Sequence, residues 1–254
     1  MIDLHSHLLP GVDDGARSVD QAVSVLARMA ASGVTDVCLT PHLLASTLGQ
    51  GVPTSHDRAF ELLRAHGGNS PRLHRGAEVM LDRPLEDGVA SERMATLAGS
   101  RYMLVEFPRL VAYGAVVQAL QRVVDIGLLP ILAHPERYAC CTVGAVRRWR
   151  ELGARMQVDS TTMLSLQGRG NRARSLLGEG LADLLASDNH GDERMLTSAA
   201  NLLVEQNGAL QASILTERNP GAILADEDLE PVPPFSIRTS WIERVRGLLE
   251  RGDR

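Results

Sequence analysis

The alternation of apolar runs with amphipathic helical segments most constrains what this chain can fold into. Each apolar or β-branched run is followed by a polar loop and then by apolar residues at helical spacing. Strands joined in this way by helices lie parallel, so the sequence predicts a parallel α/β sheet, which we expect to be closed. At 254 residues, one large barrel-like domain fits best. The expected strands are residues 2–5, 34–40, 73–79, 101–106, 128–133, 154–159 and 181–187.

The last thirty residues differ in character from the rest. Residues 231–234 read Pro-Val-Pro-Pro, which predicts a stiff linker, and residues 241–249 predict a short basic amphipathic helix. We therefore expect one barrel domain at residues 1–225 and an appended tail at 226–254, in which no motif is evident.

Metal-ligating side chains gather where the expected strands end. His5 and His7 alternate along an extended segment and therefore point the same way. The carboxyl ends of strands in a parallel barrel line one mouth, so these residues should meet. Five of the eight histidines and four carboxylates belong to this set, which scattered surface residues would not produce. Its members are His5, His7, Asp14, His42, Glu78, Glu106, His134, Asp188 and His190.

The chemistry of this set indicates a centre with more than one metal ion. Imidazole and carboxylate ligands without a thiolate suit Mn²⁺, Fe²⁺ or Zn²⁺ rather than Ca²⁺ or a closed structural zinc site. Nine candidate ligands exceed the needs of one ion. They fit two or three ions that share a bridging carboxylate and a bridging hydroxide.

Composition excludes several other classes. The net charge of −5 gives no basic surface for nucleic acid or membranes, and no apolar stretch approaches the ~20 residues of a membrane helix. The first strand begins at residue 2 without a signal-peptide pattern. Three cysteines make no disulfide framework. These features predict a cytoplasmic protein that does not insert into a membrane.

The motifs resemble, in order and over residues 1 to about 224, the polymerase-and-histidinol-phosphatase (PHP) superfamily. Within it, the Pro-Gly-Val-Asp-Asp14-Gly-Ala loop and His-Pro-Glu-Arg137-Tyr are most similar to the bacterial protein-tyrosine phosphatases encoded with capsular and exopolysaccharide genes. The motifs that carry the resemblance are His5-x-His7, Thr-Pro-His42, Gly-Ala-Glu78, Val-Glu106-Phe, Ala-His134-Pro-Glu-Arg-Tyr and Ser-Asp188-Asn-His190.

The resemblance implies a distorted (β/α)₇ barrel that holds three divalent ions, manganese first, with iron or zinc as alternatives. It implies that His5, His7, Glu78 and Asp188 hold one ion, and that Glu78 bridges to a second held by Glu106 and His134. The third ion would be held by Asp14, His42 and His190. The implied substrate is a phosphotyrosine protein, namely the tyrosine-rich tail of a membrane-associated kinase that controls polysaccharide export.

The hydrolysis expected at such a centre is an in-line displacement at phosphorus. Our hypothesis is that a hydroxide bridging two ions attacks, while the third ion and Arg137 bind the remaining oxygens. Arginine suits this role because its planar fork pairs bidentately with phosphate. Arg194 is a second candidate for the same task. The competing interpretation of both arginines is an ordinary ion pair. Glu136 we interpret as an orienting or surface group.

Other functions stay open at the level of sequence. A phosphoesterase with the same centre could act on a small molecule such as histidinol phosphate or a nucleotide. Such an enzyme would need a lid, for which residues 43–54 are the candidate, whereas a tyrosine peptide needs an open mouth. A non-catalytic scaffold is disfavoured by the complete ligand set, and a nuclease by the acidic balance. The oligomeric state is not predicted.

Two features are expected to be unrelated to catalysis. Cys141 and Arg147 match the Cys-x₅-Arg loop of cysteine-dependent tyrosine phosphatases, but Arg147 is predicted to lie inside a helix. Asp159 ends an expected strand, yet the Asp-Ser-Thr sequence favours a helix N-cap.

Overall fold

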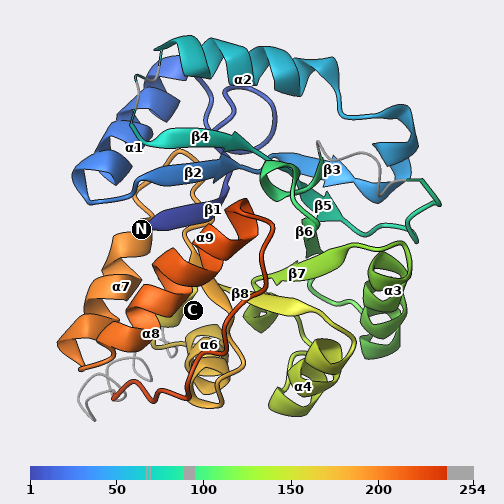
Figure 1. Cartoon of the computed structure of the whole chain (residues 1–254), viewed down its shortest axis with the longest axis vertical. Helices are drawn as coiled ribbons and strands as arrows, with labels where there is room; N and C mark the ends of the chain where they lie inside the picture. Colours follow the sequence, from blue (N-terminus) through green and yellow to red (C-terminus); the bar gives the residue numbers. More distant parts are fainter. Residues whose placement is uncertain (67, 69, 89–94, 239–254) are drawn as a thin grey trace, which may run out of the picture.

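The chain forms two parallel sheets, seen here in a computed structural model that describes residues 1–66, 68, 70–88 and 95–238 (Figure 1). Within these residues one sheet has the order β1-β2-β4 and the other β3-β5-β6-β7-β8-β9. The parallel α/β prediction is confirmed. The strands are β1 Ile2–Ser6, β2 Asp36–Leu39, β3 His42–Leu44, β4 Arg72–Arg75, β5 Glu78–Met80, β6 Tyr102–Glu106, β7 Leu129–Ala133, β8 Arg155–Asp159 and β9 Leu184–Ala186.

Helices surround the strands (Figure 1). The first begins after Ser18, whose hydroxyl accepts a hydrogen bond from the backbone N–H of Gln21 at 3.2 Å. The Gln21 amide then donates to the carbonyl of Gly191 and ties this helix to the loop after β9. The helices are α1 Val19–Ala31, α2 Thr54–His66, α3 Tyr113–Asp125, α4 Val143–Glu151, α5 Ser160–Leu164, α6 Gly168–Gly178, α7 Leu196–Glu205, α8 Ala209–Ser213 and α9 Asn219–Leu224.

The predicted strand at residues 73–79 is divided into β4 and β5, so the expectation of a single strand there is wrong. The strand predicted at residues 34–40 is present as β2, and after a break of two residues it is followed by β3, a short strand that was not predicted. Pro41 has no N–H for a strand ladder. Gly76 lies so near the neighbouring strand that an added Cβ would be 2.8 Å from the Cys38 sulfur. Both segments pass from one sheet into the other, and their two breaks lie side by side.

The first strand lies beside the end of the last one. Ser6 forms a parallel bridge with Asn189, whose carbonyl accepts a hydrogen bond from the His7 N–H at 2.7 Å. The Asp188 N–H donates to the carbonyl of His5 at 3.0 Å. The segments that carry His5, His7 and Asp188 are thus held together by backbone bonds.

The hydrophobic core has three parts. The largest packs the six-stranded sheet against its helices, and a second packs the other sheet against α1 and α2. A third joins the strands to each other and to α9, and includes Leu4, Cys38, Ile131 and Ile223. Cys38 is fully buried, as a small core residue should be.

The segment after α9 lies against the body of the protein. Val232 is buried, and the Phe235 N–H donates to the carbonyl of Leu177 in α6 at 3.1 Å. Arg238 pairs with Gln206 through two hydrogen bonds. The predicted helix at 241–249 lies outside the described residues, and the domain division at residue 225 stays a prediction.

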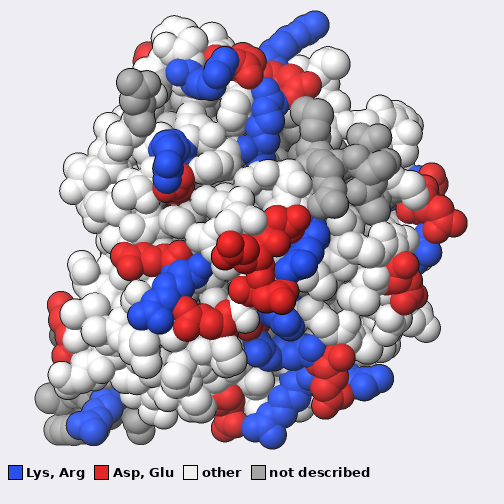
Figure 2. Space-filling model, viewed as in Figure 1, with Lys and Arg blue, Asp and Glu red and all other residues white. Residues whose placement is uncertain are grey.

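Charges of both signs are interspersed on the face seen in Figure 1, as Figure 2 shows. Arg101 pairs with Asp226 and Asp228, and Arg218 with Glu230. Among the described residues of this face, positive charges thus lie beside negative ones. Among the described residues, no helix has the length and apolar character needed to cross a membrane.

Candidate metal centre

All nine predicted ligands come together beyond the strands. Their nitrogen and oxygen atoms form four overlapping groups, and within each group the atoms lie within 4.8 Å of one another. His42 and Glu78 begin β3 and β5 rather than end strands, because each of these short strands starts just after a two-residue break. The groups are His7, Asp14, His42 and His190; His5, Glu78 and His134; His5, His7 and Asp188; and His42, Glu78 and Glu106.

The deepest part of the centre is formed by four buried side chains. The Nε2 atoms of His5 and His7 lie 3.2 Å apart. Each lies 3.2–3.3 Å from Oε2 of Glu78. Oδ1 of Asp188 is 3.3 Å from His5 Nε2 and 3.4 Å from His7 Nε2. Two imidazoles and two carboxylates therefore face one small space.

Glu78 also reaches a second set of ligands. Its Oε1 is 2.9 Å from Nε2 of His134, while its Oε2 is 3.2 Å from Nδ1 of His42. The same His42 nitrogen lies 3.0 Å from Oε1 of Glu106. Because its two oxygens face different histidines, Glu78 has the geometry of a bridging carboxylate.

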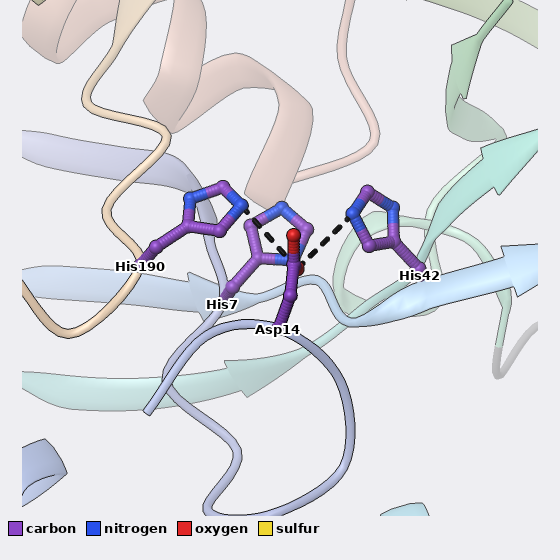
Figure 3. A group of neighbouring side chains, drawn as sticks. All are labelled: His7, Asp14, His42 and His190. Atoms are coloured by element: carbon purple, nitrogen blue, oxygen red, sulfur yellow. Dashed lines mark ion pairs between the residues drawn. The ribbon is translucent and has the colours of Figure 1, made fainter. Parts of the chain in front are cut away.

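The outermost group is centred on Asp14, which stands between His42 and His190 (Figure 3). Its Oδ1 is 3.4 Å from His42 Nε2 and 3.5 Å from His190 Nε2. The ring of His190 stacks on that of His7, with centroids 4.2 Å apart. The Asp14 side chain is 69 % exposed, so this group is the one most open to solvent.

Two neighbours that the sequence did not single out orient the deep histidines. Oδ2 of Asp13 accepts from Nδ1 of His7 at 2.8 Å, and Oε1 of Gln157 lies 2.9 Å from Nδ1 of His5. Burial works to raise the pKa of Asp13, but the bond and charge of His7 outweigh it and lower the pKa to about 2. Ionised Asp13 can only accept, so His7 carries its proton on Nδ1 and directs Nε2 inward.

The loop that carries these aspartates requires a glycine. An added Cβ at Gly15 would lie 1.9 Å from the carbonyl oxygen of His7, so only glycine permits this approach. The Gly15 N–H also donates to Asp13 at 3.0 Å. Close packing of the loop thus holds Asp13 against His7.

The electrostatics of the centre favour bound positive charge. Burial disfavours a charged His42, yet its bonds to Glu106 and Glu78 raise its pKa to about 10. Burial acts likewise on His7, and the hydrogen bonds that its ring donates to Asp13, Asp188 and Glu78 raise its pKa well above the ordinary value. Crowded carboxylates and inward-facing imidazole nitrogens are the donor set of a divalent cation, so these residues fit the metal ions that the sequence implies.

Two of the ligands have left-handed backbone conformations. His134 has φ 35° and Asp188 has φ 49°. Such conformations cost non-glycine residues on the order of 1–3 kcal/mol and are concentrated at functional sites. His134 follows the last residue of β7 directly and Asp188 lies two residues after the end of β9, and at both positions the turn aims the side chain back toward the other candidate ligands.

Arg137 and Arg194 both contact Asp188 and both line a cavity of about 510 Å³ beside the ligands. Nη2 of Arg137 lies 2.5 Å from Oδ2 of Asp188 and also contacts Asp159. Nη1 of Arg194 donates to the carbonyl of Asp188 at 2.6 Å, and its Nε pairs with Asp192 at 2.9 Å. The structure thus brings both arginines to the cavity, and their roles stay predictions.

Asp159 is a helix N-cap, as predicted, because it accepts hydrogen bonds from the N–H groups of Thr161 and Thr162. Its other oxygen contacts Arg137, which the sequence did not indicate. Glu136 is fully buried and accepts from the Asp159 N–H at 3.0 Å. Burial and the charge of Asp159 raise its pKa to about 8, in keeping with an orienting role.

The Cys-x₅-Arg match has no catalytic geometry. Cys141 is buried, and burial raises the pKa of its thiol to about 12, so no thiolate forms at neutral pH. Arg147 lies in α4 and pairs with Glu179 on the surface. This geometry supports the expectation that both residues are unrelated to catalysis, which stays a prediction.

Two further arginines line the cavity and were missed by the sequence reasoning. Arg109 follows Glu106 by three residues, so its place after the end of β6 could have identified it. Arg169 stands in the first turn of α6 and belongs to no motif, so its place could be known only from the packing of α6.

Three proteins with similar sequences are named as tyrosine-protein phosphatases, one of them putatively. Putative tyrosine-protein phosphatase CapC of Staphylococcus aureus is 29 % identical over 199 residues, which cover 75 % of this chain and 77 % of that protein. Tyrosine-protein phosphatase CpsB of Streptococcus pneumoniae is 27 % identical over 250 residues, covering 89 % and 99 %. Tyrosine-protein phosphatase YwqE of Bacillus subtilis is 24 % identical, covering 94 % and 97 %.

Solved structures show the same fold. A chain from the crystal structures of YwqE from Bacillus subtilis and CpsB from Streptococcus pneumoniae, described as unique metal-dependent tyrosine phosphatases, matches with a TM-score of 0.78 and 24 % identity. The match covers 94 % of this chain and all of that one. The phosphotriesterase from Mycobacterium tuberculosis matches more distantly, with a TM-score of 0.55, 13 % identity and coverage of 88 % and 93 %.

The family itself is established by a direct match. The family model of capsular polysaccharide synthesis proteins CpsB/CapC matches residues 1–225, which include all nine candidate ligands. The resemblance drawn from the sequence motifs is thereby confirmed, and the chain belongs to the CpsB/CapC family of capsular polysaccharide synthesis.

Proposed function

We propose that this protein is a metal-dependent protein-tyrosine phosphatase that hydrolyses phosphotyrosine monoesters. The observation that carries the proposal is the convergence of nine metal-ligating side chains beside a cavity that arginines also line. The relatives named tyrosine-protein phosphatases support the same reaction. Hydrolysis of an anionic phosphate ester requires a cationic centre and hydrogen-bond donors for the phosphoryl oxygens.

Three divalent ions fit the ligand set, with manganese as the proposed metal and iron or zinc as alternatives. When bound, such ions neutralise phosphoryl oxygens and lower the pKa of bound water to about 7. His5, His7, Glu78 and Asp188 would hold the first ion. Glu78, Glu106 and His134 would hold the second, and Asp14, His42 and His190 the third. The hydrogen bonds that join β1 to the residues after β9 likewise support a closed, distorted (β/α)₇ barrel around this centre.

Arg137 and Arg194 are proposed to bind the phosphoryl group. Contacts with Asp159 and Asp188 fix the Arg137 guanidinium at the cavity wall through Nη2. The side chain keeps 23 % of its surface exposed there, which leaves donors to face an anion. Because the phenol of tyrosine has a pKa of about 10, phenolate leaves readily and the site needs no dedicated general acid.

An open mouth favours a protein substrate over a small molecule. Residues 43–54, the candidate lid, form the end of β3 and the 3₁₀ turn η1 Ala45–Gln50, where Leu48 is buried. Within the described residues, none of this segment lines the cavity. We propose that the substrate is a phosphotyrosine protein, the tyrosine-rich tail of a membrane-associated kinase controlling capsular or exopolysaccharide synthesis, and that the reaction takes place in the cytoplasm.

A direct comparison of substrates tests this function. Metal-loaded protein should hydrolyse a phosphotyrosine peptide with a kcat/KM at least about tenfold above that for histidinol phosphate, a margin equivalent to one charged contact. A reversed preference would keep the metal centre and assign the protein to small-molecule metabolism. Hydrolysis of neither compound would overturn the proposal.

A further inference from the structure

The cavity beside the metal centre continues into a second hollow that the proposed reaction does not use. This hollow has a volume of about 540 Å³ and shares Thr161, Thr162 and Arg169 with the first. Its remaining lining comes from the residues that join α5 to α6 and from the first turns of α6, including Arg172. A substrate with its phosphate at the metal ions could therefore extend over α6.

The arginines along this path lack the partners that surface arginines usually have. In the part of the chain that the structure describes, no carboxylate lies within ion-pair distance of Arg109 or Arg169. By contrast, Arg137 is held by Asp159 and Asp188. Arg172 donates through Nε to the carbonyl of Glu136 at 2.8 Å, a neutral acceptor that leaves its charge uncompensated.

Positive charge is concentrated around Arg169 as a result. Burial lowers the pKa of its guanidinium, and the neighbouring charges of Arg109, Arg137 and Arg172 lower it further. Repulsion among like charges costs free energy in the free protein, and a bound anion relieves that cost. Thr161 and Thr162 add hydroxyl groups to the same wall.

We propose that Arg109, Arg169 and Arg172 form a subsite for a second anionic group of the substrate, a carboxylate or a phosphate near the phosphotyrosine in sequence. The inference rests on the proposed function and specifies its substrate class: peptides in which the phosphotyrosine has acidic or phosphorylated neighbours. Arginine suits either group, since its fork pairs bidentately with both.

Three phosphotyrosine peptides of equal length test the subsite. One has neutral neighbours, one has glutamates beside the phosphotyrosine, and one has a non-hydrolysable phosphonate analogue of phosphotyrosine there. The measured quantity is the ratio of kcat/KM for each anionic peptide to that for the neutral peptide. This ratio is independent of how much of a variant is folded or loaded with metal.

In the metal-loaded wild type we expect a ratio of about ten or more, as a charge-assisted hydrogen bond to arginine provides. Arg169→Glu should lower it to about one or below, and Arg109→Glu should lower it in the same direction. Arg148→Glu is the matched control, because Arg148 lies exposed on α4 and pairs only with Glu151 among the described residues, so its ratio should equal that of the wild type.

The two anionic peptides separate the sources of the second charge. If the ratio is high only for the glutamate peptide, the group bound at the subsite is a carboxylate. If it is high only for the phosphonate peptide, that group is a second phosphotyrosine. Equal kcat/KM for all three peptides in the wild type, or a ratio unchanged by Arg169→Glu, would overturn the subsite and leave the phosphatase proposal intact. Hydrolysis of none of the peptides would overturn both.

Discussion

Arg137 contacts Asp188 at the edge of the metal centre, with 2.5 Å between Nη2 and Oδ2. The other oxygen of Asp188, Oδ1, lies 3.3 Å from Nε2 of His5. One carboxylate thus joins the proposed phosphate-binding arginine to the deepest proposed ligands. Burial works to raise the pKa of Asp188, but His5, His7 and Arg137 hold it well below the usual range, so the group is ionised and available to a cation.

Replacement of Arg137 by alanine should lower kcat/KM for a phosphotyrosine peptide by about 100-fold, as for other lost donors to a charged transition state. Arg137→Lys should retain only part of the wild-type kcat/KM, because an ammonium group cannot pair bidentately with phosphate. Steady-state kinetics and metal content per chain are measured together. Metal content should stay at the wild-type level. Activity and metal lost in parallel would instead make Arg137 a structural support for Asp188.

Asp13→Ala should weaken metal binding by about 10–100-fold, since His7 loses the acceptor that fixes its ring. Isothermal titration calorimetry of the metal-stripped protein with Mn²⁺ measures the affinity for this ion. The control is Asp20→Ala, which removes an exposed carboxylate from the first turn of α1. Equal affinities in the two variants would show that His7 needs no orienting partner.

Cys141→Ala should retain full activity, because the thiol is buried and its pKa is raised to about 12 by that burial. Thiol alkylation of the native protein should likewise leave peptide hydrolysis unchanged. The variant is expected to lose about 1 kcal/mol of stability for a small buried side chain. If it folds with full metal content yet is inactive, the metal mechanism proposed here does not hold.

Asp36→Asn should destabilise the protein near neutral pH but not in acid. Burial works to raise the pKa of Asp36, but Arg72 and His74, whose nitrogens lie 2.9 Å and 2.8 Å from its Oδ1, lower it on balance. A carboxyl whose pKa is lower in the folded state stabilises that state above its unfolded value of 3.8, and the contribution is lost as pH falls further. Thermal unfolding of both proteins from pH 7 to pH 3 measures this. The difference in Tm should shrink below about pH 4; a constant difference would rule out the ionic contribution.

The candidate ligands could be identified from sequence because most of them lie close to strands that local patterning reveals. His134 and Asp188 follow apolar runs directly, and parallel strands bring such positions to one side. The additional strand β3 and the division between β4 and β5 could not be predicted in this way. The switch at Pro41 and Gly76 depends on how two distant segments pair, and no local pattern records it.

The orienting and anion-binding residues were the least accessible to sequence. Asp13 was visible beside Asp14, but its hydrogen bond with His7 appears only in the fold, whereas the place of Asp14 near His42 and His190 is implied by the family resemblance. Arg169 lies 32 residues after Arg137 in sequence and comes near it through the packing of α6. Such residues act through tertiary neighbours, so their function appears only in the folded chain.

Hydrolysis of a phosphotyrosine peptide by chelator-stripped protein, before and after return of Mn²⁺, tests the central claim most directly. The geometry of the nine ligands predicts that stripping abolishes hydrolysis and that Mn²⁺ restores it, with the folded state retained throughout by circular dichroism. Hydrolysis that survives complete stripping and is abolished by thiol alkylation would contradict the metal-dependent mechanism.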